Sequence, residues 1–253
     1  MDNKALYKDI EFSAWSDRSG LTESERILID RYLAADLPTL EAGTAGGRIL
    51  FGMLDLGFTK LHGFDYVEEF IQSARQRDID QAIDFRVQDA QNLDYQDNSF
   101  DQILYLQQIM SAIESAPARE SAAKEAFRIL RPGGTALFSF LDLQYRISRA
   151  PFSIYYWYLR AARTLSRRKI PINNWPWLKL NQRFNWSSLL DRPPYNYWFS
   201  REEPIRLLEN AGFHIEQYGS DAQILTRQEL PPRNEPPKDS EFSGMTYAVC
   251  TKK

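Results

Sequence analysis

Short β-like runs alternate with helix-like runs over most of this chain, and this alternation limits its fold more than any other feature. The expected strands cover residues 38–41, 60–64, 83–88, 100–106 and 135–141, and the helices between them cover 46–56, 67–77 and 117–130. Alternating strands and helices are typical of a parallel sheet with helices on both faces. Ser200 and Glu203 predict the capped start of another helix, which ends at Gly212 and precedes strands over 213–218 and 245–251. We therefore expect an α/β fold.

The composition fits a single globular domain. At 253 residues, with 43% hydrophobic and 26% charged residues, the chain is long enough to bury a core of its own. The single cysteine, Cys250, excludes an intrachain disulfide and a cysteine-based zinc site. The N-terminus lacks the residue order of a signal peptide, and no apolar stretch approaches the roughly 18 residues of a membrane span. We expect a cytoplasmic protein.

The heptapeptide Glu41-Ala-Gly-Thr-Ala-Gly-Gly47 joins the first expected strand to the first helix. Small residues in such a turn let a ligand approach the backbone and the helix N-terminus. Glycine-rich turns also occur in many α/β proteins because they pack tightly, so this turn alone is a weak signal.

Three further features follow the glycine-rich turn in order. Asp65 ends the second strand about twenty residues later, where a carboxylate can accept both hydroxyl protons of a ribose. Asp89 and Ala90 end the third strand, where an adenine edge would lie, and Asn98-Ser-Phe-Asp101 leads into the fourth strand. Each feature has a local explanation as a cap or a turn, but all of them in this order are hard to assign to chance.

With these motifs the chain resembles the class I S-adenosylmethionine (SAM)-dependent methyltransferases. The family pattern acidic-x-Gly-x-Gly-x-Gly matches Glu41, Gly43 and Gly47, while Ala45 replaces the middle glycine. Leu130-Arg-Pro-Gly-Gly134 resembles a further landmark of the family. The resemblance covers about residues 37–141 and 200–253. It implies a three-layer Rossmann-like sheet, mostly parallel with an antiparallel last strand.

The resemblance also implies SAM as the cofactor. The implied cofactor-binding residues are Glu41, Gly43, Thr44, Ala45, Gly47, Asp65, Tyr66, Asp89, Ala90, Leu106 and Gln107. A dinucleotide site would keep the turn more open for a pyrophosphate, so Ala45 favours a cofactor without phosphate there. The alternatives are an NAD(P)-dependent oxidoreductase and a non-catalytic SAM-binding module.

The same resemblance divides the single domain, residues 1–253, into four parts. These are an N-terminal helical cap (1–36), a cofactor-binding half (37–141), a helical, aromatic-rich, acceptor-binding lid insertion (142–199), and a C-terminal helix with the last strands (200–253). Tyr7, Phe12 and Trp15 of the cap either close over the cofactor or simply pack. Between the last two strands, Pro231-Pro232 and Pro236-Pro237 predict an exposed loop or hairpin.

Methyl transfer from a sulfonium depends on alignment and desolvation more than on a base. A base is needed only for a poorly acidic acceptor, and Asp142, at the end of the fifth strand, is the best-placed candidate. The competing interpretation of Asp142 is a helix cap. His62 and His214 are expected to be structural, because a metal site needs at least three convergent ligands and these two lie apart in the expected topology. We expect no metal.

The insertion is strongly basic and aromatic. Ten of the 31 Lys and Arg residues, but only two of the 34 Asp and Glu residues, lie between Asp142 and Phe199. On a helix starting near Phe152, the aromatic residues would form a stripe beside Arg160, Arg163, Arg167 and Arg168. Three interpretations remain open: a lid packed on its own core, a clamp for an acidic acceptor, and an interfacial helix resting on anionic lipid.

The expected acceptor is a small or lipid-linked molecule, anionic or glycosylated, that is methylated on oxygen or nitrogen. Aromatic side chains stack on sugars and planar rings, which fits such a molecule. The candidate acceptor-binding residues are Gln108, Tyr145, Arg146, Tyr156 and Trp198. Nucleic acid is not expected, because the acidic remainder of the chain would repel a long polyanion. Peripheral membrane contact through the insertion is a further expectation.

Overall fold

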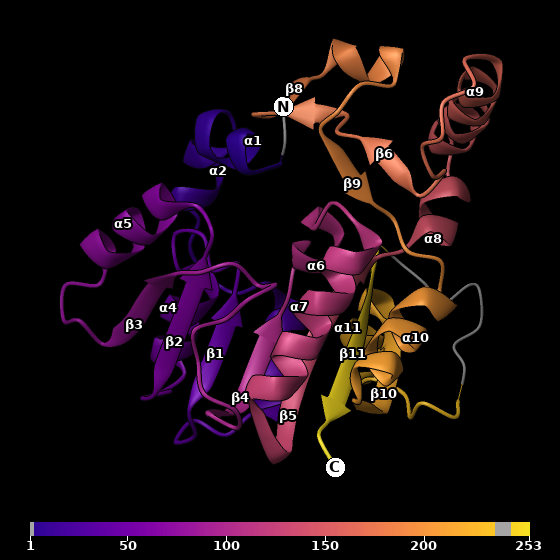
Figure 1. The fold of residues 1–253 in the computed structure, drawn as a ribbon. Coiled ribbons are helices and arrows are strands. Elements are labelled where there is room, and N and C mark those ends of the chain that lie inside the picture. The colour runs from indigo at the N-terminus through magenta and orange to yellow at the C-terminus, as the bar shows by residue number, and fades with distance from the viewer. Residues whose placement is uncertain (1–2, 236–243) are drawn as a thin grey trace.

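A seven-stranded sheet forms the centre of the molecule, in the order β10-β11-β5-β4-β1-β2-β3 (Figure 1). The computed structural model describes residues 3–235 and 244–253. The strands are β1 (Thr39–Ala42), β2 (Leu61–Asp65), β3 (Ile83–Val87), β4 (Phe100–Tyr105), β5 (Leu130–Leu141), β10 (His214–Ser220) and β11 (Met245–Thr251). Neighbouring strands run parallel, except that β11 is antiparallel to both β5 and β10. The predicted Rossmann-like sheet is therefore confirmed.

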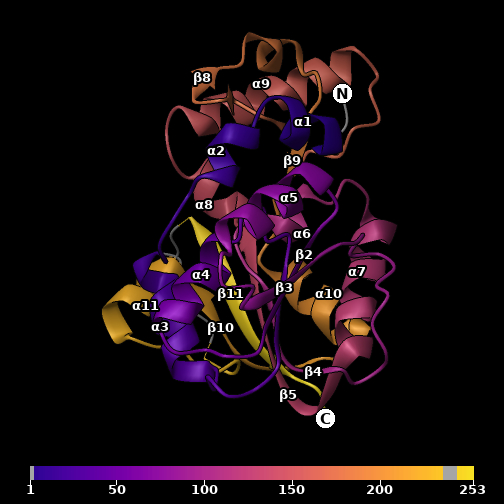
Figure 2. The same cartoon turned by 90° about the vertical axis from the view of Figure 1, so that its left-hand side faces the viewer.

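Helices cover both faces of the sheet (Figures 1 and 2). One face carries α7 (Ala116–Ile129) and α10 (Glu202–Ala211). The other carries α3 (Glu23–Tyr32), α4 (Arg48–Asp55), α5 (Glu68–Arg77) and α11 (Asp221–Arg227). No helix among the described residues is long and apolar enough to cross a bilayer.

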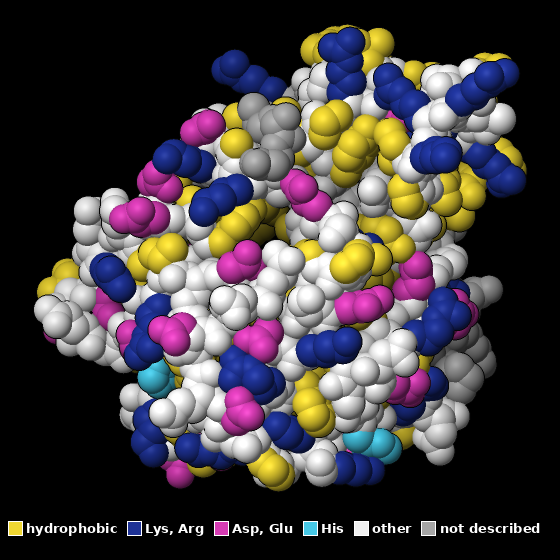
Figure 3. Space-filling view, viewed as in Figure 1, with side chains coloured by type: hydrophobic (Ala, Val, Ile, Leu, Met, Phe, Trp, Pro, Cys, Tyr) yellow, Lys and Arg dark blue, Asp and Glu magenta, His cyan; other side chains and the backbone are white. Residues whose placement is uncertain are grey.

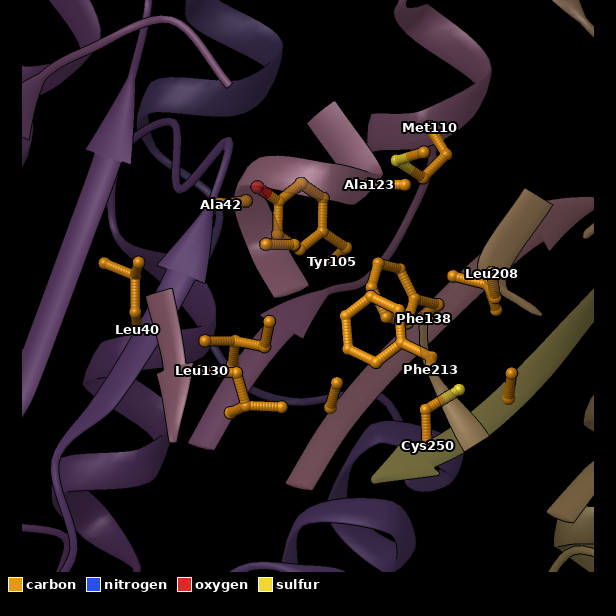
Figure 4. Close-up of a cluster of buried hydrophobic side chains, with 14 of the residues drawn as sticks. Leu40, Ala42, Tyr105, Met110, Ala123, Leu130, Phe138, Leu208, Phe213 and Cys250 are labelled. Carbon is orange, nitrogen blue, oxygen red and sulfur yellow. The ribbon is translucent and has the colours of Figure 1, made fainter. Parts of the chain in front are cut away.

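Large buried side chains fill the space between the sheet and α7 and α10 (Figure 4). The ring of Phe138 lies 5.3 Å from that of Tyr105 and 5.2 Å from that of Phe213. Burial of each such side chain contributes roughly 1.5–3 kcal/mol, so this cluster fixes the position of β4 and β5. Cys250 belongs to the same cluster, and burial raises the pKa of its thiol.

Two details near the C-terminus differ from the expected pattern. Helix α11 lies between the last two strands, where a loop is predicted, and Ser220 with Gln223 forms its capping box. Pro231 is buried, and its carbonyl oxygen accepts a hydrogen bond of 3.2 Å from the backbone N–H of Tyr218. The prediction of an exposed loop is therefore wrong at Pro231. Strand β10 lies at the edge of the sheet, and the carbonyl oxygen of a proline can still accept a hydrogen bond from such a strand. Pro236-Pro237 lies outside the described residues.

The segments before and after the cofactor-binding half meet above the carboxyl ends of the strands (Figure 1). From the N-terminus come α1 (Asn3–Asp9) and α2 (Phe12–Ser16). The insertion supplies α8 (Leu143–Ile147), α9 (Phe152–Leu165), β6 (Asn174–Pro176), β7 (Lys179–Leu180), β8 (Arg183–Phe184), the 3₁₀ helix η1 (Trp186–Leu190) and β9 (Tyr195–Tyr197). Its second half thus contains four short strands, in two small antiparallel sheets, and one 3₁₀ helix, where the resemblance implied a helical insertion.

Candidate active site

A cavity of about 450 Å³ lies at the carboxyl ends of β1, β2 and β4, beside α1 and α2. Ligands of open parallel sheets bind outside this edge. Ten of the eleven residues that the resemblance implies for the cofactor line the cavity, namely Glu41, Gly43, Thr44, Ala45, Asp65, Tyr66, Asp89, Ala90, Leu106 and Gln107. Gly47 does not line it, whereas Gln108, from the acceptor set, does.

The glycine-rich turn brings its backbone close to this cavity. Gly43, Ala45 and Gly47 have φ angles of +61°, +46° and +83°, in the left-handed region. A Cβ on Gly43 would lie 2.1 Å from Cδ1 of Ile109, which also lines the cavity, so both the backbone and the contact favour glycine. Gly47 precedes α4, and a Cβ on it would approach the ring of Phe51, so its role is in packing.

Gly46 of the same turn lies in close contact with the backbone of Ser16, the last residue of α2. A Cβ on Gly46 would lie 2.0 Å from the backbone carbonyl oxygen of Ser16. Nη1 of Arg77 donates to the carbonyl oxygens of both Ser16 and Gly46, at 2.7 Å each. This glycine therefore anchors the N-terminal cap, a role that sequence analysis did not assign to it.

Glu41 is a buried carboxyl at the end of β1. The hydroxyl of Thr44 donates a hydrogen bond of 2.7 Å to its Oε2. Burial raises the pKa of Glu41 to about 8, against the lowering effect of Thr44 and Arg48. A cationic group in the cavity would favour the ionised form of this carboxyl.

Asp65 ends β2 and is also buried. Its Oδ2 accepts a hydrogen bond from the backbone N–H of Ala45 at 3.0 Å, and its Oδ1 accepts one from Val67 at 2.9 Å. Burial raises the pKa of Asp65 to about 6, although these backbone groups lower it. Each carboxylate oxygen keeps a further lone pair, so Asp65 can also accept the two hydroxyl protons of a ribose. The residues present therefore fit SAM.

Polar groups from the ends of β2 and β3 line the same cavity. Oδ1 of Asp89 accepts a hydrogen bond of 2.9 Å from the backbone N–H of Gln91, which makes a local turn. The ring of Tyr66 lies 5.6 Å from Nζ of Lys4. Ala90 adds a small apolar contact beside Asp89. This part of the wall combines small, aromatic and polar groups, as an adenine site requires.

The end of β4 is held by a network that reaches α3. Gln107 donates a hydrogen bond to Oε1 of Glu25, and Glu25 forms a two-point ion pair with Arg48 at 2.6 and 2.7 Å. Burial alone would raise the pKa of Glu25, but the ion pair with Arg48 reverses the shift and lowers it. Sequence analysis missed Glu25, although Thr22 and Glu25 form a capping box whose pattern is visible in the sequence.

Two aromatic residues of the cap also line the cavity. The rings of Tyr7 and Trp15 meet edge to face at 6.4 Å, and Tyr7 packs against Trp177 of the insertion at 5.7 Å. Phe12 instead stacks on Phe70 at 5.2 Å. Of the three aromatic residues considered, Tyr7 and Trp15 thus border the cofactor cavity and Phe12 contributes packing.

Asp142 lies outside the cavity and has two partners of its own. Its Oδ1 accepts a hydrogen bond of 3.0 Å from the backbone N–H of Tyr145 at the start of α8, and its Oδ2 pairs with Arg201 at 3.3 Å. The hydroxyl of Tyr145 accepts a hydrogen bond from Arg149, also away from the cavity. Asp142 therefore has the cap role, and we do not retain it as the base.

The other residues chosen from the insertion gather in a separate aromatic cluster. The guanidinium of Arg146 lies 3.5 Å from the ring centre of Phe152 and 4.7 Å from that of Trp198, and burial lowers its pKa to about 10. Tyr156 stacks against Trp175 at 6.5 Å. Because α8 begins directly after β5, the chain carries these residues away from the strand ends and into the core of the insertion.

The two histidines lie elsewhere on the molecule. His62 contacts Asp84 at 3.3 Å and the ring of Phe100 at 5.1 Å, and His214 lies 3.7 Å from Glu216. Neither histidine lines the cavity. Within residues 3–235 and 244–253, no three His, Cys, Asp or Glu side chains converge as a metal site would require.

A second cavity, of about 420 Å³, lies beside the first and under the insertion. Ile113 and Glu114, which follow α6 (Ile109–Ala112), line both cavities. Tyr195 and Tyr197 of β9 line the second one. An acceptor bound there would be next to the cofactor cavity.

A polar cluster joins α1, α6 and β9 at this boundary. Asn3 donates from its backbone N–H to Glu114 at 2.8 Å and from Nδ2 to the carbonyl oxygen of Tyr195 at 3.2 Å. Nδ2 of Asn196 donates to Oε1 of Gln108 at 3.1 Å. The Oδ1 atoms of Asn3 and Asn196 are buried and have no hydrogen-bond partner among the described residues. Sequence analysis missed Asn3, Glu114 and Asn196, because no spacing rule brings such distant positions together.

Comparisons with known proteins agree with this geometry. Residues 40–138 match a family model described as a methyltransferase domain. The curated 27-O-demethylrifamycin SV methyltransferase of Amycolatopsis mediterranei is 28% identical over 137 residues, which are 50% of this chain and 49% of that protein. The match thus spans about half the length of this relative.

Solved methyltransferase structures share the fold. A SAM-dependent methyltransferase from Methanosarcina mazei superimposes with a TM-score of 0.67 at 18% identity, covering 92% of this chain and 98% of that one. The CcbJ methyltransferase from Streptomyces caelestis gives a TM-score of 0.65 at 14% identity and covers 98% of both chains.

The fold and the cavity are those of a SAM-dependent methyltransferase domain. Residues 40–138 match the methyltransferase domain model, and the whole chain shares the Rossmann-like fold that the motifs predict. The matched domain and the fold indicate SAM as the cofactor, and no comparison supports the dehydrogenase alternative.

Proposed function

We propose that this chain is a SAM-dependent methyltransferase and that it acts on an oxygen or nitrogen atom of a small-molecule acceptor that enters between α1, α6 and β9. The carrying observation is the buried, unpartnered amide oxygen of Asn3, which lines the cofactor cavity, together with that of Asn196, whose Nδ2 donates to the cavity-lining Gln108. A buried oxygen atom without a hydrogen-bond donor destabilises the fold by about 1–3 kcal/mol. A hydroxyl or amine of the acceptor molecule would donate to these oxygens, and hydroxyls and amines are the groups that become O-methyl and N-methyl products.

Residues at the strand ends would hold the cofactor in place. When bound, SAM supplies a methyl group on a positively charged sulfur. Asp65 would bind the ribose hydroxyls, and Glu41 offers a buried carboxyl to the cationic end. Tyr7 and Trp15 line the cavity and would exclude water, which strengthens the electrostatic contacts inside.

Glu114 replaces Asp142 as the candidate base. It lines both cavities, and its Oε1 accepts a hydrogen bond from the backbone of Asn3, which fixes the carboxylate at their boundary. Its remaining lone pairs are available to take a proton from an alcohol. A well-placed base contributes typically 10²–10⁴-fold to such a step.

The lining of the second cavity favours an acceptor with a sugar or a planar ring. Tyr195, Tyr197, Pro193 and Pro194 supply flat apolar surfaces there. The curated relative's name, 27-O-demethylrifamycin SV methyltransferase, records transfer to an oxygen, which supports the oxygen acceptor. A lipid-linked sugar would satisfy the same requirements.

Incubation of the purified protein with methyl-labelled SAM and a fractionated metabolite extract tests this proposal. We expect label in a small product whose new methyl carbon has the NMR shift of an O-methyl or N-methyl group. Asn196→Ala should raise the KM for that acceptor and leave SAM affinity unchanged, whereas Asn210→Ala, an exposed residue of α10, should alter neither. Label found only in protein or nucleic-acid fractions would contradict the proposal.

A further inference from the structure

Helix α9 leaves one apolar face uncovered. Its exposed residues include Ile154, Trp157 and Leu165, and Leu165 is 85% exposed. These side chains lie on one side of the helix, while Leu159 and Arg163 are buried on the other side. Single exposed apolar residues are common, but a contiguous group of them indicates a binding surface.

The neighbouring segment β8–η1 extends this apolar face. Trp186 is 75% exposed, and Leu189 and Leu190 are exposed beside it. The hydroxyl of Tyr158 donates to the carbonyl oxygen of Leu189, and the hydroxyl of Tyr155 donates to that of Ser188 at 2.7 Å. These bonds fasten η1 to α9. The two sets of residues therefore form one surface, here called the docking surface: Ile154, Trp157, Leu165, Trp186, Leu189 and Leu190.

The insertion that carries the docking surface has many exposed cations and no exposed acidic residue. Eight cations of the insertion are exposed, namely Arg149, Arg160, Arg167, Arg168, Lys169, Lys179, Arg183 and Arg192. The only acids in residues 142–199, all of which the structure describes, are Asp142 and Asp191. Both are buried and paired, with Arg201 and Arg163. Figure 3 shows the result as dark blue and yellow side chains over the insertion, at the upper right.

We infer that the docking surface binds an anionic lipid bilayer. Tryptophan prefers the boundary between lipid headgroups and chains, where Trp157 and Trp186 would lie. The aliphatic side chains would enter the apolar layer, and the exposed cations of the insertion would attract anionic headgroups. This inference rests on the surface alone and is independent of the acceptor proposed above.

Two other partners fit the same surface less well. Single-stranded nucleic acid is held by stacking of bases on aromatic rings, and Ile154, Leu165, Leu189 and Leu190 cannot stack. A second copy of this chain bound through the same face would bring two sets of eight exposed cations together, which is repulsive. A bilayer satisfies both the apolar and the charged parts.

Sedimentation with vesicles tests the inference directly. The full chain should sediment with vesicles that contain phosphatidylserine but not with vesicles of phosphatidylcholine alone, and added salt should weaken binding. The double variant Trp157→Ser, Trp186→Ser should bind at least about tenfold more weakly. The control is Ile79→Ser, an exposed apolar residue outside the insertion, and this variant should bind as the unaltered protein does.

A charge variant provides the second arm. Changing Arg149, Arg160, Arg167 and Lys169 to Gln should reduce vesicle binding at least about tenfold, whereas the same change at Arg26, Lys60, Lys124 and Arg206 should not. All eight positions are exposed, so folding should be unaffected. Equal binding by the tryptophan variant and the unaltered protein would overturn the inference. If the protein does not bind vesicles, two other results would also overturn the inference. One is tight, salt-sensitive binding to single-stranded RNA, and the other is self-association that the tryptophan variant loses.

Discussion

At the scale of single residues, Asp65 connects cofactor binding to pH. The carboxylate must be ionised to accept two ribose hydroxyl protons, and burial raises its pKa to about 6. Only the ionised form is competent, so the apparent Kd for SAM should fall by about tenfold between about pH 5 and pH 7. Isothermal titration calorimetry at the two pH values measures this. Asp65→Asn should bind weakly at both, and a pH-independent Kd in the unaltered protein would contradict the role of Asp65.

Glu41 should make the stability of the cofactor-free protein depend on pH. Burial raises its pKa from an ordinary 4.5 to about 8, so the folded state favours the neutral carboxyl. The stabilising contribution is fully present below pH 4.5 and is lost as the pH rises through about 8. Glu41→Gln should therefore flatten the decline of the unfolding free energy over this range and be the more stable protein at high pH.

Urea denaturation at several pH values measures the effect of Glu41→Gln. Glu120→Gln, an exposed carboxyl on α7, is the control and should keep the slope of the unaltered protein. An identical slope in Glu41→Gln would show that the buried carboxyl is not the source. Asp65 should also make the unfolding free energy decline as the pH rises, but at lower pH than Glu41, because burial raises its pKa to about 6.

The sequence predicts the positions of some of these site residues but not of others. Asp65 and Glu41 end strands beside a glycine-rich turn, so local order predicts their location. Asp142 also ends a strand, but it precedes a helix, and its carboxylate is used as the cap. Asn3 contacts Tyr195, the neighbour of Asn196, only because α1 and β9 both lie above the strand ends, and that placement depends on tertiary packing.

At the scale of elements, Arg163 differs from the other arginines of α9. It is buried, pairs with Asp191 at 2.7 Å, and donates to the carbonyl oxygens of Pro171 and Asn174 at 2.6 and 2.7 Å. Breaking a buried pair costs roughly 3–5 kcal/mol, whereas exposed arginines contribute little. Arg163→Gln should thus lower the Tm by roughly 6 °C or more, given about 2–4 °C per kcal/mol in a chain of this size.

Thermal unfolding of Arg163→Gln and Arg160→Gln compares a buried with an exposed position on one helix. Arg160→Gln should leave the Tm nearly unchanged, and equal Tm values for both variants would contradict the structural role of Arg163. Helical periodicity grouped Arg163 with Arg160, Arg167 and Arg168 in one stripe. It could not identify the partner, because Asp191 is 28 residues away.

The insertion and the cap are also coupled. Trp177 does not line the cofactor cavity, but it packs on Tyr7, which does. Trp177→Ala should therefore weaken SAM binding severalfold by loosening α1, while the exposed Trp186→Ala should leave the Kd unchanged. Calorimetric titration separates the two. An unchanged Kd in Trp177→Ala would mean that the insertion acts independently of the cofactor site, as the expected division into cap and lid implies.

Element boundaries were predictable where a periodic pattern runs long enough. The strands of the large sheet and helices α4, α5, α7 and α10 all lie within a few residues of their expected positions. The short strands β6, β7, β8 and β9 have two or three residues each, too few for an alternating pattern to appear. Helix α11 was missed although its capping box is present in the sequence.

At the scale of the whole molecule, the cofactor cavity lies where separate parts of the chain meet. The strand ends form its floor, α1 and α2 close one side, and the insertion supports α1 through Trp177. Gly46 receives the backbone of Ser16, so the glycine-rich turn also positions the cap. A ligand that contacts both the turn and the cap should therefore stabilise the molecule as a unit.

This arrangement predicts a large thermal response to SAM. A ligand at about 100 times its Kd stabilises the folded state by about 2.7 kcal/mol, which corresponds to a rise in Tm of roughly 5–11 °C for a chain of this size. Differential scanning calorimetry measures the rise, and Asp65→Ala should show about half of it or less at the same SAM concentration, because it loses roughly 1.5–3 kcal/mol of charge-assisted binding. Hydrogen exchange locates the effect: the amides of α1 and α2 should exchange more slowly with SAM, while those of α10, on the far side of the sheet, should gain only what global stabilisation provides. A rise in Tm without added protection in α1 and α2 would show that the cap does not take part in cofactor binding.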